Sequence, residues 1–366
     1  MSNSAAILNP RLRAAGEWFL RSGIQEAFGG VARYYRPDLD GNALVSTEIT
    51  GYATSALVFL HNVTGDSECL EAALRAGVFL ARDAWNSALR AMPFEYSSNG
   101  HAPEPLAYFF DTGIIVRALL ALWRNSHDVE FLDAAQRCAE SMARDFAAGS
   151  EFHPVLELPS KRPVTRDPRW SRSPGCYQLK AALAWCELAE ETGRADFRAL
   201  YDQELRRALR GHDAFPSGEG EGARTMDRLH AYSYFLEGLL PRATERACAA
   251  ALREGIARTA ALLAGVAPVF ERSDVYAQLL RVRIFADALG VVPLDWGAAE
   301  GEAAAIAKFQ CCESDRRTGG GYYFGQKAGQ YLPYINPVST AFCAQALEFW
   351  RQRCAGSFHP DWRTLI

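Results

Sequence analysis

The 366-residue sequence has no run of about 18 apolar residues, so no segment is predicted to cross a membrane as a helix. Its beginning, MSNSAAILNPRLRAAG, has neither the apolar core nor the cleavage pattern of a secretory signal. The nine cysteines are odd in number and scattered, and the adjacent Cys311 and Cys312 have no further cysteine or histidine at zinc-ligand spacing. We therefore expect a cytoplasmic protein without a disulfide framework.

Neither sign of charge is in excess. Lysine and arginine total 39 against 43 aspartate and glutamate, for a net charge of −4, and no basic patch stands out. Nucleic acid is therefore not a predicted partner. The arginines mostly stand beside acidic residues in helical segments, which is typical of a solvated surface. Hydrophobic residues make up 49% of the chain, as in an ordinary globular protein.

Helical periodicity is the dominant pattern in the sequence. Apolar residues recur three and four positions apart in twelve segments, and polar turns or longer connections separate them. The predicted helices cover residues 10–22, 46–63, 67–84, 106–125, 129–147, 175–192, 195–211, 227–240, 244–264, 273–289, 296–311 and 336–353.

These helices come in pairs that repeat along the chain. EITGYATSALVFLHNVTGDSECLEAALRAGVFL and FDTGIIVRALLALWRNSHDVEFLDAAQRCAESM each hold an apolar helix, a short polar turn and an amphipathic helix. Three more pairs follow, and the unpaired helix over 336–353 could take the N-terminal helix as its partner by closing a ring. The connections between pairs are long, and loops of that length are usually functional. They cover roughly residues 23–45, 85–105, 148–174, 212–226 and 312–335.

This arrangement resembles the six-hairpin, (α/α)6-toroid superfamily over nearly the whole chain. The resemblance rests on the repeat and on the alternating loop lengths, since no signature motif is present. It implies an all-α fold with a single toroid domain over residues 1–366 and short β-hairpins in the mouth loops. That superfamily includes glycoside hydrolases, polysaccharide lyases and sugar epimerases, whose substrate cleft lies at the mouth that the long loops form. Related toroids include terpenoid cyclases, so the fold alone does not decide the function.

One predicted helix carries a polar face. Asp227, His230, Tyr234 and Glu237 are spaced 0, 3, 7 and 10 along RTMDRLHAYSYFLEGLL, so they share one side of a helix. Glu237 lies about 15 Å along the helix axis from Asp227, at about 1.5 Å per residue. We expect burial at that depth to raise the pKa of Glu237, as a general acid requires. The alternative is a structural ion pair with a buried arginine.

Further candidates lie at the starts of the other inner helices. The predicted acid and base residues are Glu48, Asp111, Asp227, His230 and Glu237. The residues predicted to position substrate are Tyr52, Arg228, Tyr234, Asp274, Arg281 and Tyr323. Helix capping is the plainer interpretation of Glu48, Asp111 and Asp274, and a satisfied core histidine is that of His230.

The predicted function is acid/base chemistry on an oligosaccharide or another small molecule, without a metal or an organic cofactor. Aromatic residues in the long loops suit sugar rings, and the arginines and lysines there suit an acidic sugar. Glycoside hydrolysis and the epimerisation or lysis of a uronate both remain open. A terpenoid-cyclase-like enzyme is an alternative, although no Asp-x-Asp-Asp motif is present. A non-catalytic toroid that binds a glycan or a protein is the third possibility.

Overall fold

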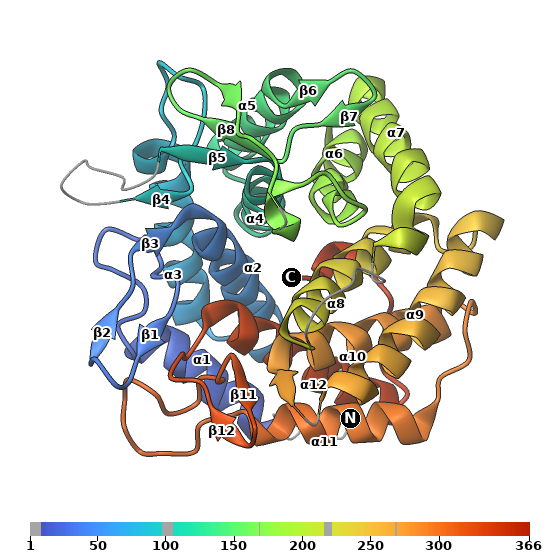
Figure 1. Cartoon of the computed structure of the whole chain (residues 1–366). Helices are drawn as coiled ribbons and strands as arrows, with labels where there is room; N and C mark the ends of the chain where they lie inside the picture. Colours follow the sequence, from blue (N-terminus) through green and yellow to red (C-terminus); the bar gives the residue numbers. More distant parts are fainter. Residues whose placement is uncertain (1–8, 97–104, 168, 216–221, 268) are drawn as a thin grey trace, which may run out of the picture.

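The computed structural model describes residues 9–96, 105–167, 169–215, 222–267 and 269–366. Parts of the predicted connections 85–105 and 212–226 lie outside these residues. Figure 1 looks along the axis of a ring in which helices alternate between an inner and an outer layer. The predicted toroid of helical hairpins is therefore confirmed.

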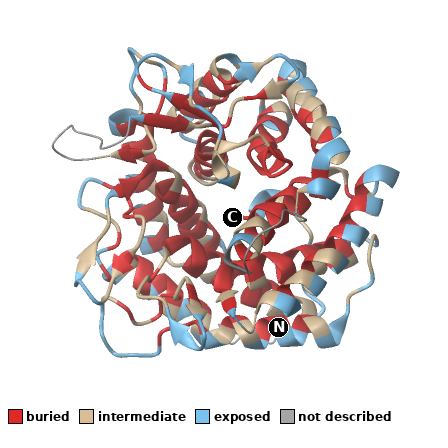
Figure 2. Ribbon diagram, in the orientation of Figure 1, coloured by how far each residue is buried: buried red, intermediate tan, exposed pale blue. Residues whose placement is uncertain are grey.

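Six helices form the inner layer. Each contacts the next one in the chain order of this layer, and the last contacts the first, so the ring is closed. Most of their residues are buried, as the red colour of these helices in Figure 2 shows. The inner helices are α2 (Thr47–Thr64), α4 (Phe109–Ser126), α6 (Gln178–Thr192), α8 (Gly222–Gly238), α10 (Ser273–Ala288) and α12 (Pro337–Cys354).

The outer layer covers the ring with amphipathic helices. Each outer helix contacts the inner helix of its own hairpin, and α1 contacts α12, which confirms that the N-terminal helix completes the sixth hairpin. The outer helices are α1 (Pro10–Arg21), α3 (Ser67–Val78), α5 (Val129–Asp145), α7 (Ala195–Gly211), α9 (Arg246–Val266) and α11 (Trp296–Lys308).

The helix boundaries follow local capping chemistry. The Ser46 hydroxyl accepts a hydrogen bond from the backbone N–H of Ile49 and caps the start of α2. Gly65 ends that helix with a φ of 75°, a left-handed conformation that costs glycine little, and Asp66 then caps α3. Such tight turns hold the two helices of a hairpin antiparallel.

Several predicted helix boundaries were wrong. The last third of the segment 67–84 is a π-helix, η1 (Phe79–Ala84). The first residues of 106–125 form a strand, because they pair with the following loop. α8 begins at Gly222, five residues before its predicted start. The remaining short helices are η2 (Trp170–Arg172), η3 (His212–Ala214), η4 (Leu240–Arg242) and η5 (Trp362–Thr364).

Short antiparallel strands join the long connections to one another. β3 pairs with β4 with Val45 opposite Tyr96, and β10 pairs with β11 with Phe270 opposite Lys327. Strands from neighbouring loops are thus tied together beside the starts of the inner helices, and the predicted mouth hairpins are confirmed. The strands are β1 (Tyr35–Arg36), β2 (Gly41–Asn42), β3 (Val45–Ser46), β4 (Glu95–Tyr96), β5 (Leu106–Tyr108), β6 (Ala147–Ala148), β7 (Glu151–Phe152), β8 (Val155–Glu157), β9 (Arg162–Pro163), β10 (Phe270–Arg272), β11 (Gly325–Lys327) and β12 (Gln330–Tyr331).

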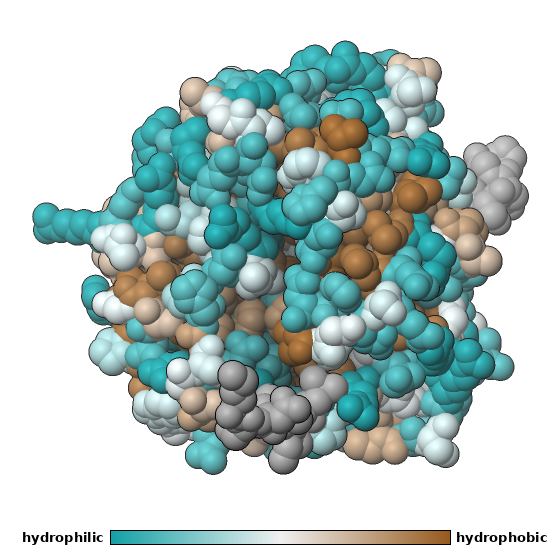
Figure 3. Space-filling view, turned by 180° about the vertical axis from the view of Figure 1, so that it is seen from behind, coloured by the Kyte–Doolittle hydropathy of each residue, from teal (hydrophilic) through white to brown (hydrophobic). Residues whose placement is uncertain are grey.

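The C-terminal segment 355–366 folds back into the ring, and its last residue lies near the centre of Figure 1. Ile366 is buried, its carbonyl oxygen lies 3.1 Å from the Lys180 ammonium, and its N–H donates to Gln345. From behind, Figure 3 shows a mostly hydrophilic surface with apolar side chains visible near its middle. Among the helices of the described ranges, none has both the length and the apolar character to cross a membrane.

Candidate active site

A cavity of about 550 Å³ opens at the end of the ring where the inner helices begin. Its wall combines first-turn residues of α2, α4 and α10 with residues of the long connections. We call this cavity the mouth cavity. The ionisable residues of its wall are Arg33, Glu48, Glu95, Asp111, Arg169, Arg172, His230, Arg272 and Asp274.

Two carboxyl groups from adjacent inner helices line the mouth cavity. Ser46 caps α2, so Glu48 is not needed as the cap and contributes to the cavity wall. Burial raises the pKa of Glu48 to about 7, against the opposing charge of Arg33. Burial, and then the charge of Glu48, raise the pKa of Asp111 well above its ordinary value. We call these two residues the carboxyl pair.

The surroundings of the second carboxyl oxygen of Asp111 also favour its protonated form. Asp111 Oδ2 is buried and has no hydrogen-bond partner among the described residues. An ionised carboxylate oxygen without a partner is costly in such a place, so the protonated form is favoured. Asp111 can therefore present a proton to a group that enters the cavity.

Arg33 is the cation whose charge acts on the pKa of both members of the carboxyl pair. It stands in the connection before α2, and its charge lowers the pKa of both Glu48 and Asp111. Its Nη1 donates to Glu95 Oε1 at 2.7 Å, and its guanidinium lies 5.0 Å from the Phe94 ring centre. These contacts hold the positive charge at the cavity wall.

His230 lies on α8 in the same cavity and is neutral at physiological pH. Burial, followed by the nearby charge of Arg272, lowers the pKa of His230 to about 4. Its Nδ1 lies 2.8 Å from Gln278 Oε1 and 3.5 Å from Asp274 Oδ2. Since both neighbours are oxygens, we assign the proton to Nδ1, which leaves the lone pair on Nε2 as a base.

Arg272 ties two aspartates together beside His230. It bonds Asp274 through Nε and Nη2, at 3.0 and 2.6 Å, and Asp227 through Nη1 at 2.7 Å. Burial raises the pKa of Asp274, but Arg272 and His230 outweigh it, and the net shift is downward. Asp274 is therefore an ionised group that orients its neighbours. Asp227, the second carboxylate bound to Arg272, is half-exposed.

Aromatic side chains form another part of the wall. Trp170, from η2, meets the rings of Tyr177 and His230 at centroid distances of 4.9 and 6.1 Å and interplanar angles of 83° and 72°. Phe110 and Tyr234 also line the cavity, with ring centres 4.7 Å apart. An indole fixed by its neighbours in this way offers a surface for the apolar face of a sugar ring.

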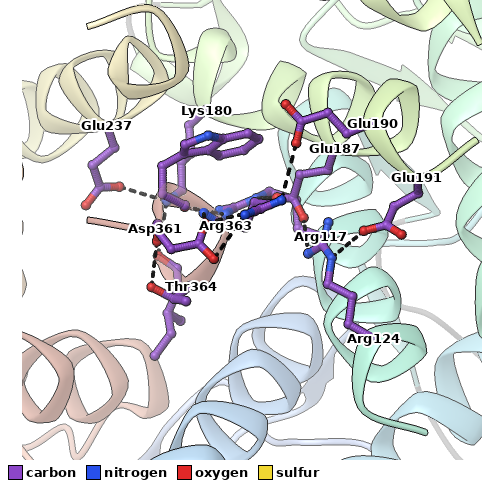
Figure 4. Close-up of polar contacts among 12 residues, drawn as sticks. Arg117, Arg124, Lys180, Glu187, Glu190, Glu191, Glu237, Asp361, Arg363 and Thr364 are labelled. Atoms are coloured by element: carbon purple, nitrogen blue, oxygen red, sulfur yellow. Dashed lines mark hydrogen bonds and ion pairs between the residues drawn. The ribbon is translucent and has the colours of Figure 1, made fainter. Parts of the chain in front are cut away.

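Glu237 lies deeper in the ring, away from the mouth cavity. It is fully buried, 2.5 Å from Arg281 Nη2 and 3.0 Å from Lys180 Nζ. Figure 4 shows its contact with Lys180. Burial raises the pKa of Glu237, but Arg281 and Lys180 outweigh it, so the predicted rise is wrong and the pKa is lowered. A carboxylate held ionised between two cations is poorly suited to donate a proton.

The mouth cavity brings together about half of the predicted site residues. Those on its wall are Glu48, Asp111, His230, Tyr234 and Asp274. Tyr52 lies just behind Tyr234 and donates to its hydroxyl at 3.0 Å, whereas Arg228 bonds the Phe215 carbonyl and Tyr323 stacks on Tyr331. The remaining predicted residues, whose partners are described above, are Asp227, Glu237 and Arg281.

Among the wall residues that the sequence analysis did not select are Arg33, Trp170 and Arg272. They lie outside the inner helices, where no helical period indicates which way a side chain points. Arg33 and Trp170 stand in the predicted long connections 23–45 and 148–174, which is the signal that could have found them, whereas Arg272 stands in the short link before α10. In the part of the chain that the structure describes, no three His, Cys, Asp or Glu side chains are grouped as metal ligands.

No family model matches the sequence, and no curated protein matches it. Solved structures do match the fold. Cellobiose 2-epimerase from Spirochaeta thermophila is 15% identical with a TM-score of 0.71, over 95% of this chain and 100% of that one. A sugar epimerase from a ruminal bacterium is 14% identical with a TM-score of 0.71, over 90% and 94%. Unsaturated glucuronyl hydrolase from Bacillus sp. GL1 is 14% identical with a TM-score of 0.64, over 92% and 95%. The chain thus has the fold of the (α/α)6-toroid enzymes.

Proposed function

We propose that this protein is a glycoside hydrolase that acts on an acidic saccharide, with the carboxyl pair of Glu48 and Asp111 at its centre. The observation that carries the proposal is that both carboxyl groups line one cavity, where burial raises the pKa of each and the charge of Glu48 raises that of Asp111 further. Glycoside hydrolysis needs two carboxyl groups in different protonation states across the scissile bond. Asp111, whose buried Oδ2 has no hydrogen-bond partner among the described residues, is assigned as the acid, and Glu48 as the base or nucleophile.

The charge of the wall supports an acidic substrate. Four arginines and four carboxyl residues line the mouth cavity. Arg272 is paired with Asp274 and Asp227, and Asp167 pairs with Arg169 and lies 3.9 Å from Arg172. These pairs hold guanidinium groups at the cavity wall, and Arg33 stands beside the carboxyl pair. A substrate carboxylate would accept hydrogen bonds from such groups.

The structures with the same ring support a reaction on sugars. They are named for the epimerisation of cellobiose and the hydrolysis of unsaturated glucuronyl groups. A terpenoid cyclase requires an apolar interior, and the charged wall of the mouth cavity does not suit one. The carbohydrate class is therefore the better interpretation.

The test is a product analysis in water labelled with heavy oxygen. Uronate oligosaccharides are incubated with the wild type and with Glu48→Gln, Asp111→Asn and, as a matched control, Asp227→Asn. We expect shortened products that carry one heavy oxygen, a loss of about a thousandfold in kcat for the two pair variants, and activity of the control near wild type. Full activity of Asp111→Asn would refute the assignment.

A second candidate is epimerisation or lysis with His230 as the base. It is favoured by the neutral imidazole, whose Nδ1 is held by Gln278 and whose Nε2 is left as an acceptor. The same substrates in heavy water decide between the two. Deuterium at a carbon atom, or an unsaturated end without added water, with loss in His230→Ala, would replace the hydrolase proposal.

A further inference from the structure

A second cavity, of about 750 Å³, lies at the opposite end of the ring from the mouth cavity. Its wall includes Val63, Asn125 and Gln352 from the last turns of α2, α4 and α12, and the C-terminal segment 357–365 closes one side. We call it the base cavity. Its volume is within the range of about 300–1,000 Å³ that small-molecule sites occupy.

Guanidinium groups dominate the charged wall of the base cavity. They belong to Arg117, Arg124, Arg351 and Arg363, whereas the carboxylates on the wall are Glu191 and Asp361. Further carboxylates pair with these arginines from behind. Glu187 lies 2.5 Å from Arg117 Nε and 2.6 Å from Arg124 Nη1, and only 1% of its side chain is exposed. Glu348 holds Arg351 in the same way and is equally buried. Arg363 pairs with Asp361 at 2.8 Å and with Glu190 at 3.8 Å. Each guanidinium group thus has a carboxylate partner, but Glu187, Glu190 and Glu348 are not themselves on the wall.

One guanidinium group of the wall has a hydrogen-bond donor without a partner among the described residues. Arg117 and Arg124 share the single carboxylate of Glu187, as Figure 4 shows, and Arg124 reaches Glu191 only through Nε. Arg124 Nη2 is buried and has no partner among the residues that the structure describes. A guanidinium carries five N–H groups, so these arginines retain donors for a further acceptor.

An apolar surface lies across the same cavity. Phe59 and Phe349 contribute rings 5.6 Å apart at 87°, and Val58 and Leu365 extend this surface. Apolar contact on one side and guanidinium groups on the other suit a ring compound that carries an anionic oxygen group.

We propose that the base cavity is a binding site for a small anionic ring compound of the sugar-acid or sugar-phosphate kind, separate from the mouth cavity. The anionic oxygens accept from Arg124 and Arg117, and the ring packs on Phe59 and Phe349. The inference is independent of the reaction at the mouth, because none of its wall residues belongs to the mouth cavity.

The test is calorimetric titration of the whole protein with glucuronate, a hexose phosphate and, as the neutral control, glucose. Arg124→Gln removes the unpartnered donor, and Ala121→Phe fills the cavity without changing its charge. Arg82→Gln is the matched control, because this exposed arginine pairs with Glu130 on the outside of the ring. Thermal unfolding establishes that each variant is folded.

We expect at least one of the two anions to bind the wild type, and glucose to bind at least about tenfold more weakly. The affinity for the anion should fall about tenfold or more in Arg124→Gln and in Ala121→Phe, and should not change in Arg82→Gln. The stronger anion tells a sugar acid from a sugar phosphate. Binding that survives both cavity variants would place the ligand elsewhere, and equal binding of glucose or no binding at all would also overturn the proposal.

Discussion

Replacing Glu237 with glutamine should destabilise the protein strongly. The substitution leaves the Arg281 guanidinium and the Lys180 ammonium facing each other across a neutral amide, and all three side chains are fully buried. Removing one partner of a buried ion pair costs about 3–5 kcal/mol, because the other charge remains without compensation. We therefore expect the free energy of unfolding in urea to fall by about this amount.

The pH dependence of this loss is a second, independent readout. Burial lowers the pKa of Lys180 from 10.5 to about 7 despite the charge of Glu237. The unfolded chain thus binds the extra proton between pH 7 and pH 10.5, and the stability of the wild type rises with pH across that window. Without Glu237 the pKa of Lys180 falls further. The loss in Glu237→Gln should therefore be larger below pH 7 than above it.

Asp227→Asn is the matched control, because it also removes a carboxylate of α8 that pairs with an arginine. Half of the Asp227 side chain is exposed, so its pair with Arg272 should contribute no more than about 1 kcal/mol. A loss in Glu237→Gln as small as that of the control would refute the reasoning. Unchanged stability with a loss of turnover would instead return Glu237 to the catalytic residues.

Four further predictions concern the mouth cavity and the helices of the ring. Arg33→Gln should raise the pKa of both members of the carboxyl pair and move both limbs of the pH–rate profile to higher pH, whereas Arg33→Lys should restore the profile in part. Trp170→Ala should raise KM for the saccharide more than Trp170→Phe, since a phenyl ring keeps a stacking surface; equal effects of the two would contradict stacking. Gly113→Ala should lower the free energy of unfolding by about 1–3 kcal/mol, because its Cβ would lie 2.5 Å from the Ala181 carbonyl oxygen of α6. Gly301 lies on the open face of α11, so Gly301→Ala should instead raise the free energy of unfolding by about 0.5–1 kcal/mol, measured by calorimetry.

The helical ring could be predicted from the sequence because its signals are local. Periodicity, caps such as Ser46 and turn glycines such as Gly65 act within a few residues, so they mark helices and tight turns directly. The alternation of short and long connections then placed the loops at one end. One boundary error falls where a loop forms a strand, at residues 106–108, since that pairing depends on another part of the chain.

The candidate site was predictable in part. Glu48, Asp111 and His230 were selected because the first turns of inner helices and one helix face converge on the mouth, and the cavity contains all three. Arg33 and Trp170 were not predicted, because side chains in loops follow no helical period that would indicate their direction. Helical spacing puts Glu237 on the same face as His230, but it does not say how far along the axis the cavity extends.

The sequence by itself thus determined the number, order and pairing of the helices, because hydrophobic period and capping are properties of neighbouring residues. Only the tertiary structure decided which charges meet. The pKa of Asp111 rises and that of Glu237 falls, although both are buried carboxyls on inner helices. The difference is that Asp111 faces another carboxyl across a cavity, whereas Glu237 lies between Arg281 and Lys180 from two other helices.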